Sequence, residues 1–302
     1  MSRMRVAFFG MSGPLSLGAL GAIATGHTVA AVIQPAVRRS GAGQIRSFLG
    51  GMARTVGLSR PGSLGELQRK YRFPIWAARS GADSDIASRL AALRPDLICI
   101  AGYPWILPQD TLGAAPLGAI NLHAALLPRH RGLLPLFWIY YRDDRETGVT
   151  VHRATAAPDS GEILGQASFA LERGLSVDQL NLRNGEKGSE LMGAVLGDLA
   201  TGCSSPRPQD ESLVTPAPWV RPGTAMVDFA AWDVERVWHF LAGLYPRFQE
   251  PLVAADGTPV RYGGVKGYFR EARLHPPGTV LQSSGGWELY CNGGRVQLAA
   301  AA

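Results

Sequence analysis

The chain has few cysteines and no long hydrophobic run, and these two absences argue against a disulfide-rich, zinc-stabilised or membrane-spanning protein. Its three cysteines (Cys99, Cys203 and Cys291) stand far apart and form no CxxC pair, so neither a disulfide framework nor a structural zinc site is expected. Gly, Pro and charged residues interrupt every apolar run before about 18 residues, which predicts no membrane-spanning helix. The apolar start MRVAFFG is typical of a buried first strand rather than a signal peptide. We therefore expect a cytoplasmic protein with no membrane partner.

Charge is also sparse, and several common catalytic motifs are missing. Only 18% of the residues are charged, with 30 Lys and Arg against 24 Asp and Glu, a net charge of +6. This balance permits a phosphate-bearing partner but lacks the dense basic clusters of a dedicated nucleic-acid binder. The glycines after the first strand do not form GxGxxG, and no Walker A, GxSxG or HExxH sequence occurs. The six histidines never fall in a metal-ligand spacing, so no metal is predicted.

Apolar strand-like segments alternate with helical ones over the first two thirds of the chain, which predicts an α/β fold with a Rossmann-like, mostly parallel sheet. A Pro- and Ser-rich stretch then interrupts this pattern. Beyond it, a helix from about Asp233 to Leu244 and short strand-like pieces separated by DG, GG and NGG turns predict a small OB-like β-barrel. The predicted boundaries are 1–206 for the catalytic domain, 207–222 for a linker and 223–302 for the C-terminal β-barrel domain.

The segment AINLH (119–123) carries two polar side chains of chemical interest. If it ends a parallel strand, its alternation places Asn121 and His123 on one face near the carboxyl edge, where open α/β sheets bind ligands. An amide beside an imidazole suits a reaction in which a carbonyl oxygen gains negative charge while a proton moves. Taken alone, such a pair is more often a hydrogen-bonded structural feature than a catalytic one.

The segment TVHRATAAPDSGEILGQ (150–166) contains a second candidate. Asp159 lies in a Pro-Asp-Ser-Gly sequence that favours a β-turn for conformational reasons alone. An aspartate on such a loop beside the AINLH strand would also suit the orientation and charge stabilisation of a catalytic histidine. The two interpretations stay open for this segment by itself.

Four motifs taken together resemble the 10-formyltetrahydrofolate-dependent formyltransferase family. They are PDLICIAGYPWILP, NLHxxLLPxxRG, ETGVTVH and DSGEIL, and they occur in the family's order and spacing over about residues 4–200. The family includes methionyl-tRNA formyltransferases and amino-sugar N-formyltransferases. The resemblance implies an enzyme in which Asn121, His123 and Asp159 are catalytic, with Asp159 holding His123 in the right tautomer, directly or through water. It implies 10-formyltetrahydrofolate as co-substrate and no metal.

The resemblance also implies a folate pocket formed by two loops. Its residues would be Tyr103, Trp105, Ile106, Leu107, Ala156, Ala157 and Pro158. Trp105 stands where several relatives have Arg, and Leu133-Leu134 replaces a small pair that usually follows the RG sequence, so contacts to the donor and the acceptor could both differ from those of relatives.

The acceptor is open at this point. We favour an amine of a small molecule, such as a nucleotide-linked amino sugar or a modified amino acid, possibly phosphate-bearing. Methionyl-tRNA is the alternative, favoured by the basic segment Arg38–Arg72, where the tRNA branch carries a basic insertion. A formyl-folate hydrolase or a catalytically silent folate-binding module is the alternative of another class. The sequence does not predict the oligomeric state.

Overall fold

A computed structural model describes residues 3–36, 63–272 and 274–301 of the chain. Most of the basic segment Arg38–Arg72 therefore lies outside the described residues. The chain divides into two compact units that interleave along the sequence. The first comprises residues 1–136, 146–170 and 181–218, and the second comprises residues 137–145, 171–180 and 219–302.

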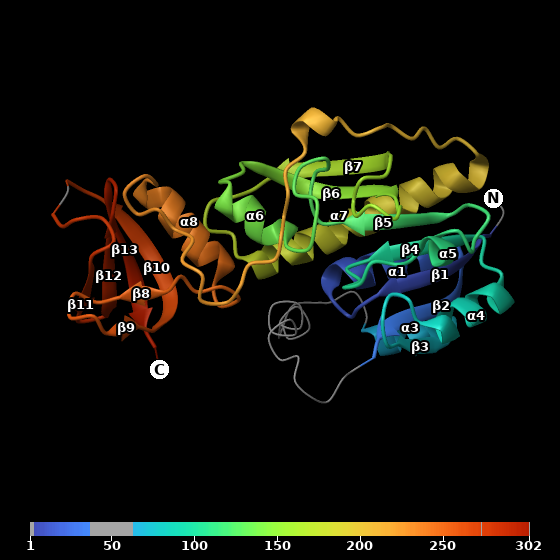
Figure 1. Cartoon of the computed structure of the whole chain (residues 1–302), viewed down its shortest axis with the longest axis horizontal. Coiled ribbons are helices and arrows are strands. Elements are labelled where there is room, and N and C mark those ends of the chain that lie inside the picture. The colour runs from blue at the N-terminus through green and yellow to red at the C-terminus, as the bar shows by residue number, and fades with distance from the viewer. Residues whose placement is uncertain (1–2, 37–62, 273, 302) are drawn as a thin grey trace. The chain divides into compact units, whose positions relative to one another are not determined.

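A seven-stranded sheet forms the centre of the first unit (Figure 1), with the order β3-β2-β1-β4-β5-β6-β7. Its first five strands are parallel, whereas β6 runs antiparallel to β5 and β7 antiparallel to β6. This confirms the predicted Rossmann-like, mostly parallel sheet. The strands are β1 (Arg5–Gly10), β2 (Thr28–Pro35), β3 (Ile75–Ala78), β4 (Leu97–Ala101), β5 (Ala119–His123), β6 (Glu146–Arg153) and β7 (Ile163–Ala170).

The strands nearest the centre of this sheet are apolar because they are covered on both faces. Val6, Ala7 and Phe8 of β1 are fully buried. One face packs on α4 and α5 through the core cluster that contains Ile86 and Leu112. The helices of the chain are α1 (Pro14–Gly26), α3 (Leu64–Tyr71), α4 (Ser84–Leu93), α5 (Gln109–Leu112), α6 (Pro135–Tyr141), α7 (Val177–Thr201) and α8 (Val234–Leu244), with a 3-10 turn, η2 (Glu211–Leu213).

Helix α7 covers the opposite face of the sheet and meets α1 at a pair of glycines. A Cβ on Gly18 would lie 2.2 Å from the carbonyl oxygen of Gly185, and a Cβ on Gly188 would lie 2.7 Å from the Leu122 side chain. Leu122 therefore points toward α7. Because strand side chains alternate, its neighbours Asn121 and His123 lie on the other face.

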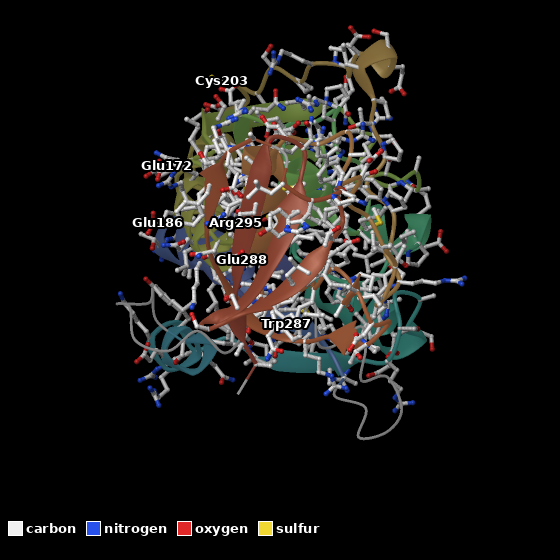
Figure 2. All side chains as sticks on the ribbon, turned by 90° about the vertical axis from the view of Figure 1, so that its left-hand side faces the viewer. Glu172, Glu186, Cys203, Trp287, Glu288 and Arg295 are labelled. Carbon is white, nitrogen blue, oxygen red and sulfur yellow. The ribbon has the colours of Figure 1, made fainter. Side chains whose placement is uncertain are left out.

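The second unit contains a four-stranded antiparallel sheet, β10-β13-β12-β11, and a two-stranded sheet, β8-β9. This agrees with the predicted small barrel-like domain, and Asp233 caps α8 by accepting a hydrogen bond from the backbone N–H of Arg236. Arg295 of β13 and Glu288 of β12 share one face of the larger sheet (Figure 2), with 3.3 Å between their charged groups. The strands are β8 (Leu252–Val253), β9 (Pro259–Val260), β10 (Tyr262–Arg270), β11 (Val280–Ser283), β12 (Gly286–Cys291) and β13 (Gly294–Ala300).

Helix α6 contributes its aromatic side chains to the core of this second unit. Phe137 is fully buried, with its ring centroid 5.6 Å from that of Phe240 and 5.1 Å from that of Phe248. The Tyr140 hydroxyl donates a hydrogen bond to the carbonyl oxygen of Leu175. Four of the residues 137–141 are aromatic, and in the structure they serve mainly as core. The domain boundaries proposed from the sequence stay a prediction, since compactness alone does not define what folds independently.

Candidate active site

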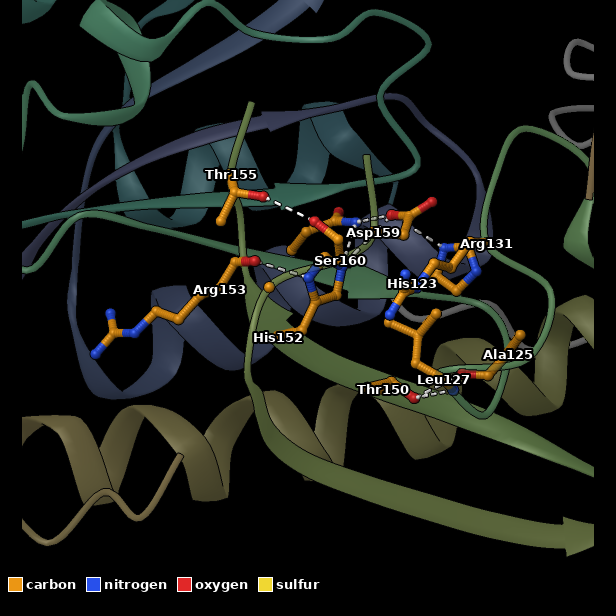
Figure 3. A network of polar contacts seen from close by, with 12 residues as sticks. His123, Ala125, Leu127, Arg131, Thr150, His152, Arg153, Thr155, Asp159 and Ser160 are labelled. Atoms are coloured by element: carbon orange, nitrogen blue, oxygen red, sulfur yellow. Dashed lines mark hydrogen bonds and ion pairs between the residues drawn. The ribbon is translucent and has the colours of Figure 1, made fainter. Parts of the chain in front are cut away.

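Strand β5 and the antiparallel strand β6 bring three polar side chains together (Figure 3). Asn121 and His123 lie at the carboxyl end of β5, and the strand register pairs Asn121 with His152 and His123 with Thr150. Because directly opposed residues share a face of the sheet, His152 lies beside Asn121. The Asn121 Nδ2 atom is 3.1 Å from His152 Nε2.

Asp159 reaches the same place from the loop between β6 and β7. Its Oδ1 atom is 3.3 Å from Asn121 Nδ2, 3.6 Å from His123 Nδ1 and 3.5 Å from His152 Nε2. Its Oδ2 atom accepts a hydrogen bond of 2.9 Å from the backbone N–H of Gly132. The three residues predicted to be catalytic are therefore clustered around one carboxylate.

The tautomer of neutral His123 is set by a backbone carbonyl group. His123 Nε2 lies 2.9 Å from the carbonyl oxygen of His130, which can only accept a hydrogen bond, so Nε2 carries the proton. The family resemblance implied that Asp159 holds this tautomer, directly or through water; in the structure the His130 carbonyl oxygen also contacts the ring, because the loop after β5 folds back over it. Nδ1, which faces Asp159, is the nitrogen that can gain a proton.

Burial and charge determine the protonation states of this cluster. His123 is only 6% exposed, and burial lowers its pKa below 6.5 although the Asp159 carboxylate acts to raise it. Burial acts to raise the pKa of Asp159, but His123, His152 and the Gly132 N–H outweigh it and hold that pKa below its ordinary value. At neutral pH the cluster therefore contains a neutral imidazole beside a carboxylate.

His152 is a member of the cluster to which sequence reasoning assigned no role. Its Nδ1 donates a hydrogen bond of 2.8 Å to the carbonyl oxygen of Arg153, which leaves Nε2 as the acceptor for Asn121. This arrangement fixes the orientation of the Asn121 amide. His152 is the last residue of the motif ETGVTVH, but only the strand register reveals that it lies opposite Asn121.

The first loop predicted to bind folate follows β4. Tyr103 packs edge-on against Phe9 and Trp105, with ring centroids 5.3 and 5.6 Å apart. Ile106 is 64% exposed, whereas Leu107 is buried in the core, so any ligand contact of Leu107 is limited to its backbone. The loop lies against Gly81, where a Cβ would come within 2.1 Å of the Ile106 carbonyl oxygen.

The second predicted folate loop precedes Asp159. Ala156, Ala157 and Pro158 are all exposed, and the Thr155 and Ser160 hydroxyls both donate to the carbonyl oxygen of Ala157. Ala154, at the base of this loop, packs against the same core cluster as Tyr103 and Trp105. The two loops therefore start from a common part of the core.

Neither a cluster of metal ligands nor a membrane-spanning helix occurs in the part of the chain that the structure describes. Within residues 3–36, 63–272 and 274–301 no group of three or more His, Cys, Asp or Glu side chains could hold a metal ion. Among those residues, no helix is both long enough and apolar enough to span a membrane.

Comparison with known proteins identifies the family. The sequence profile of the formyl transferase family matches residues 20–196. A methionyl-tRNA formyltransferase of Pelobacter propionicus is 30% identical over 241 residues, covering 78% of this chain and 73% of the relative. Another from Trichlorobacter lovleyi is 31% identical over 170 residues, and the match spans only 54% of its length.

Similarity to solved structures extends over the whole chain. An N-formyltransferase from Helicobacter canadensis, solved with folinic acid and dTDP-3-aminofucose, superposes with a TM-score of 0.68. The match covers 98% of this chain and 99% of that one at 13% identity, which shows a common fold. The chain therefore belongs to the formyl transferase family and is a transferase of that family, as its sequence motifs predict.

Proposed function

We propose that the protein transfers a formyl group from 10-formyltetrahydrofolate to an amine of a small-molecule acceptor. The observation that carries the proposal is the convergence of Asn121, His123 and Asp159 at the end of β5, with 3.6 Å between His123 Nδ1 and Asp159 Oδ1. An amide donor, a base and a carboxylate are the groups that acyl transfer through a tetrahedral intermediate requires.

The residues around the two loops fit a folate donor. The Tyr103 hydroxyl is buried and has no hydrogen-bond partner among the described residues, so it has capacity for a polar ligand atom. Trp105 and the exposed Ile106 offer apolar surface on the same loop, and Ala156–Pro158 offer small side chains on the other. Two of the similar solved structures were determined with folinic acid or tetrahydrofolic acid.

The proposed reaction moves one formyl group and one proton between the two substrates. The neutral acceptor nitrogen attacks the formyl carbon, and the carbonyl oxygen of the formyl group takes up negative charge. The acceptor nitrogen loses a proton to Nδ1 of His123. When the bond from the formyl carbon to N10 breaks, that proton passes to N10, so tetrahydrofolate leaves as a neutral amine. The net products are the formylated amine and tetrahydrofolate.

Each residue of the cluster has a separate part in this scheme. Asp159 stabilises the imidazolium that forms on His123, since opposite charges attract strongly at a buried site. Asn121 donates an N–H to the developing oxyanion. In the present arrangement its amide N–H groups face His152 and Asp159, and the longer contact, 3.3 Å to Asp159, is the one that it would exchange for the formyl oxygen.

The charge of the residues from 219 onward supports a small acceptor. From residue 219 onward the sequence has eight Lys or Arg and seven Asp or Glu residues. Arg270 is ion-paired with Glu235, and Arg295 with Glu271. Paired arginines are poorly suited to the many phosphate contacts that tRNA requires.

Methionyl-tRNA is the second candidate acceptor. The curated relatives described above are methionyl-tRNA formyltransferases, and the net charge of +6 comes largely from the sequence before residue 219. The discriminating features would therefore be in the N-terminal part, including the segment 38–62 that lies outside the described residues.

The test follows tetrahydrofolate release from 10-formyltetrahydrofolate by absorbance in three parallel reactions. One contains methionyl-tRNA, one a panel of dTDP-linked amino sugars, and one no acceptor. We expect turnover with an amino sugar and a weak salt dependence of its KM. Turnover only with methionyl-tRNA, with a steep salt dependence of KM, would identify the tRNA branch. Equal turnover without any acceptor would identify a hydrolase.

A further inference from the structure

Gln209 contacts the Asp159 loop from a segment that the proposed chemistry does not use. Its Nε2 donates hydrogen bonds of 2.8 Å to the carbonyl oxygen of Asp159 and 2.7 Å to that of Gly161. Its Oε1 accepts from Nε and Nη2 of Arg131, at 3.1 and 2.8 Å. Gln209 is thus bonded on one side to the Asp159 turn and on the other to the loop that follows β5.

The segment around Gln209 is anchored at both ends. Upstream, Arg207 and Ile163 exchange two backbone hydrogen bonds. Downstream, the backbone N–H of Arg131 donates to the carbonyl oxygen of Thr215, and that of Ala217 donates to the carbonyl oxygen of Arg131. Within this segment Gln209 is partly buried, whereas both its neighbours in sequence are exposed. Its side chain is therefore directed at the site by backbone pairing on either side.

The Asp159 turn needs such support. Asp159 has a φ of +53°, in the left-handed region that costs most non-glycine residues about 1–2 kcal/mol and Asp or Asn less. The preceding residues Ala156–Pro158 are exposed, and the side-chain hydrogen bonds of Thr155 and Ser160 remain within the turn. The side chain of Asp159 is held by the Gly132 N–H and the Asn121 amide, and the two carbonyl groups that accept from Gln209 tie the backbone of the turn to the rest of the unit.

We propose that Gln209, held in place by Arg131, is a positioning residue that fixes the Asp159 turn beside Asn121 and His123. The segment after α7 then completes the active site rather than merely connecting it to the residues that follow. The catalytic consequence rests on the function proposed above, whereas the positioning itself does not require that function.

The test compares two neighbouring substitutions in the full-length chain. Gln209→Leu removes all the hydrogen bonds of the side chain at nearly constant size. Glu211→Gln is the matched control, because it leaves a hydrogen-bonding partner for Arg131 while Gln209 is untouched; Glu211 contacts Arg131 at an exposed position. Circular dichroism and thermal unfolding check that both variants are folded.

The first measurement is the pKa of His123 by NMR titration of its ring, with the signal identified by its loss in His123→Gln. The Asp159 carboxylate acts to raise this pKa, so displacing the turn should lower it. We expect a fall of about 0.5–1 in Gln209→Leu and none in Glu211→Gln. Gln209→Asn, too short to span both sides, should show a fall as well and replaces Gln209→Leu if that variant does not fold.

The second measurement is turnover at saturating 10-formyltetrahydrofolate with whichever acceptor the wild-type protein uses. We expect kcat to fall about 10-fold or more in Gln209→Leu and to stay within about 2-fold in Glu211→Gln. An unchanged His123 pKa in Gln209→Leu and Gln209→Asn, or an equal change in Glu211→Gln, would overturn the positioning role. Absence of transfer by the wild-type protein with every acceptor would instead refute the proposed function and leave the NMR result to decide the positioning.

Discussion

At the scale of single residues, the charge of Asp159 is the feature on which the proposed chemistry depends most directly. Asp159→Asn keeps a residue that tolerates the left-handed backbone but removes the carboxylate facing His123. We expect kcat/KM for formyl transfer to fall by about 10²–10⁴-fold, as for loss of a proton-transfer group. The kcat/KM of the His123→Gln variant should fall by a similar factor.

The matched control for this pair is Asp198→Asn, an identical change at an exposed position of α7. It should leave the rate and the unfolding temperature unchanged. Near-normal transfer by Asp159→Asn or His123→Gln, with the fold verified by circular dichroism, would contradict the proposed mechanism.

His152 acts on the same chemistry through Asn121. In His152→Leu the amide of Asn121 loses the acceptor that orients it, 3.1 Å away. We expect kcat to drop about 10-fold or more, while folinic acid, measured by titration calorimetry, binds within a few-fold of wild type. Loss of folinic acid binding in parallel with kcat would indicate instead that His152 supports the pocket as a whole.

The pH dependence of transfer reports the protonation of His123. Because burial lowers the pKa of His123 below 6.5, the neutral base persists as the pH falls to that lowered value and is lost beneath it. We therefore expect kcat/KM to be constant above an acid limb whose midpoint lies below 6.5. The measurement requires an acceptor of low pKa, such as a hydroxylamine, so that acceptor protonation does not mask the limb.

A midpoint well above 6.5 with such an acceptor would contradict the assignment of His123 as the base. The limb should move to lower pH in Asp159→Asn, because the carboxylate that raises the His123 pKa is gone.

At the scale of elements, the crossing of α1 and α7 determines how closely α7 covers the sheet. A Cβ on Gly18 would meet the carbonyl oxygen of Gly185 at 2.2 Å, whereas a Cβ on Gly21 would have nothing within 4 Å. Gly18→Ala should therefore destabilise the protein by about 2–3 kcal/mol through overpacking. Gly21→Ala should stabilise it by about 0.5–1 kcal/mol, because Ala is the better helix former.

Urea unfolding of the two variants measures both effects. The two positions lie in the same helix, so the difference between them isolates the close approach from helix propensity. A stable Gly18→Ala variant would mean that the two helices can separate at little cost.

At the scale of the whole molecule, the two compact units interleave, and this bears on where the chain can be divided. The rings of Phe137 and Phe240 lie 5.6 Å apart, and those of Tyr141 and Trp232 5.2 Å apart. A chain that ends at residue 206 retains α6 but loses the aromatic partners of its side chains. We expect it to bind the dye ANS and to lack a cooperative unfolding transition.

A folded, monomeric fragment 1–206 with cooperative unfolding would instead support the catalytic domain boundary predicted from the sequence. Such a fragment would also lack Gln209, so its His123 pKa would provide an independent test of the positioning proposed above.

The sequence by itself determined the class of fold, the family and the candidate catalytic residues. The class of fold depends on local pattern, namely apolar strands that alternate with helices. The family and the candidate catalytic residues came instead from four motifs that resemble a known family, because the two polar residues on AINLH do not by themselves indicate catalysis. Local pattern is readable because helix caps and strand alternation involve neighbours in the chain.

Only the tertiary structure decided how these residues support one another. His152 opposes Asn121 because of a strand register, His130 sets the tautomer of His123 through a returning loop, and Gln209 reaches Asp159 across 50 residues of sequence. Likewise, the aromatic helix α6 packs with α8, far along the chain. Such contacts depend on which distant segments the fold brings together, and no periodicity in a single sequence encodes that pairing.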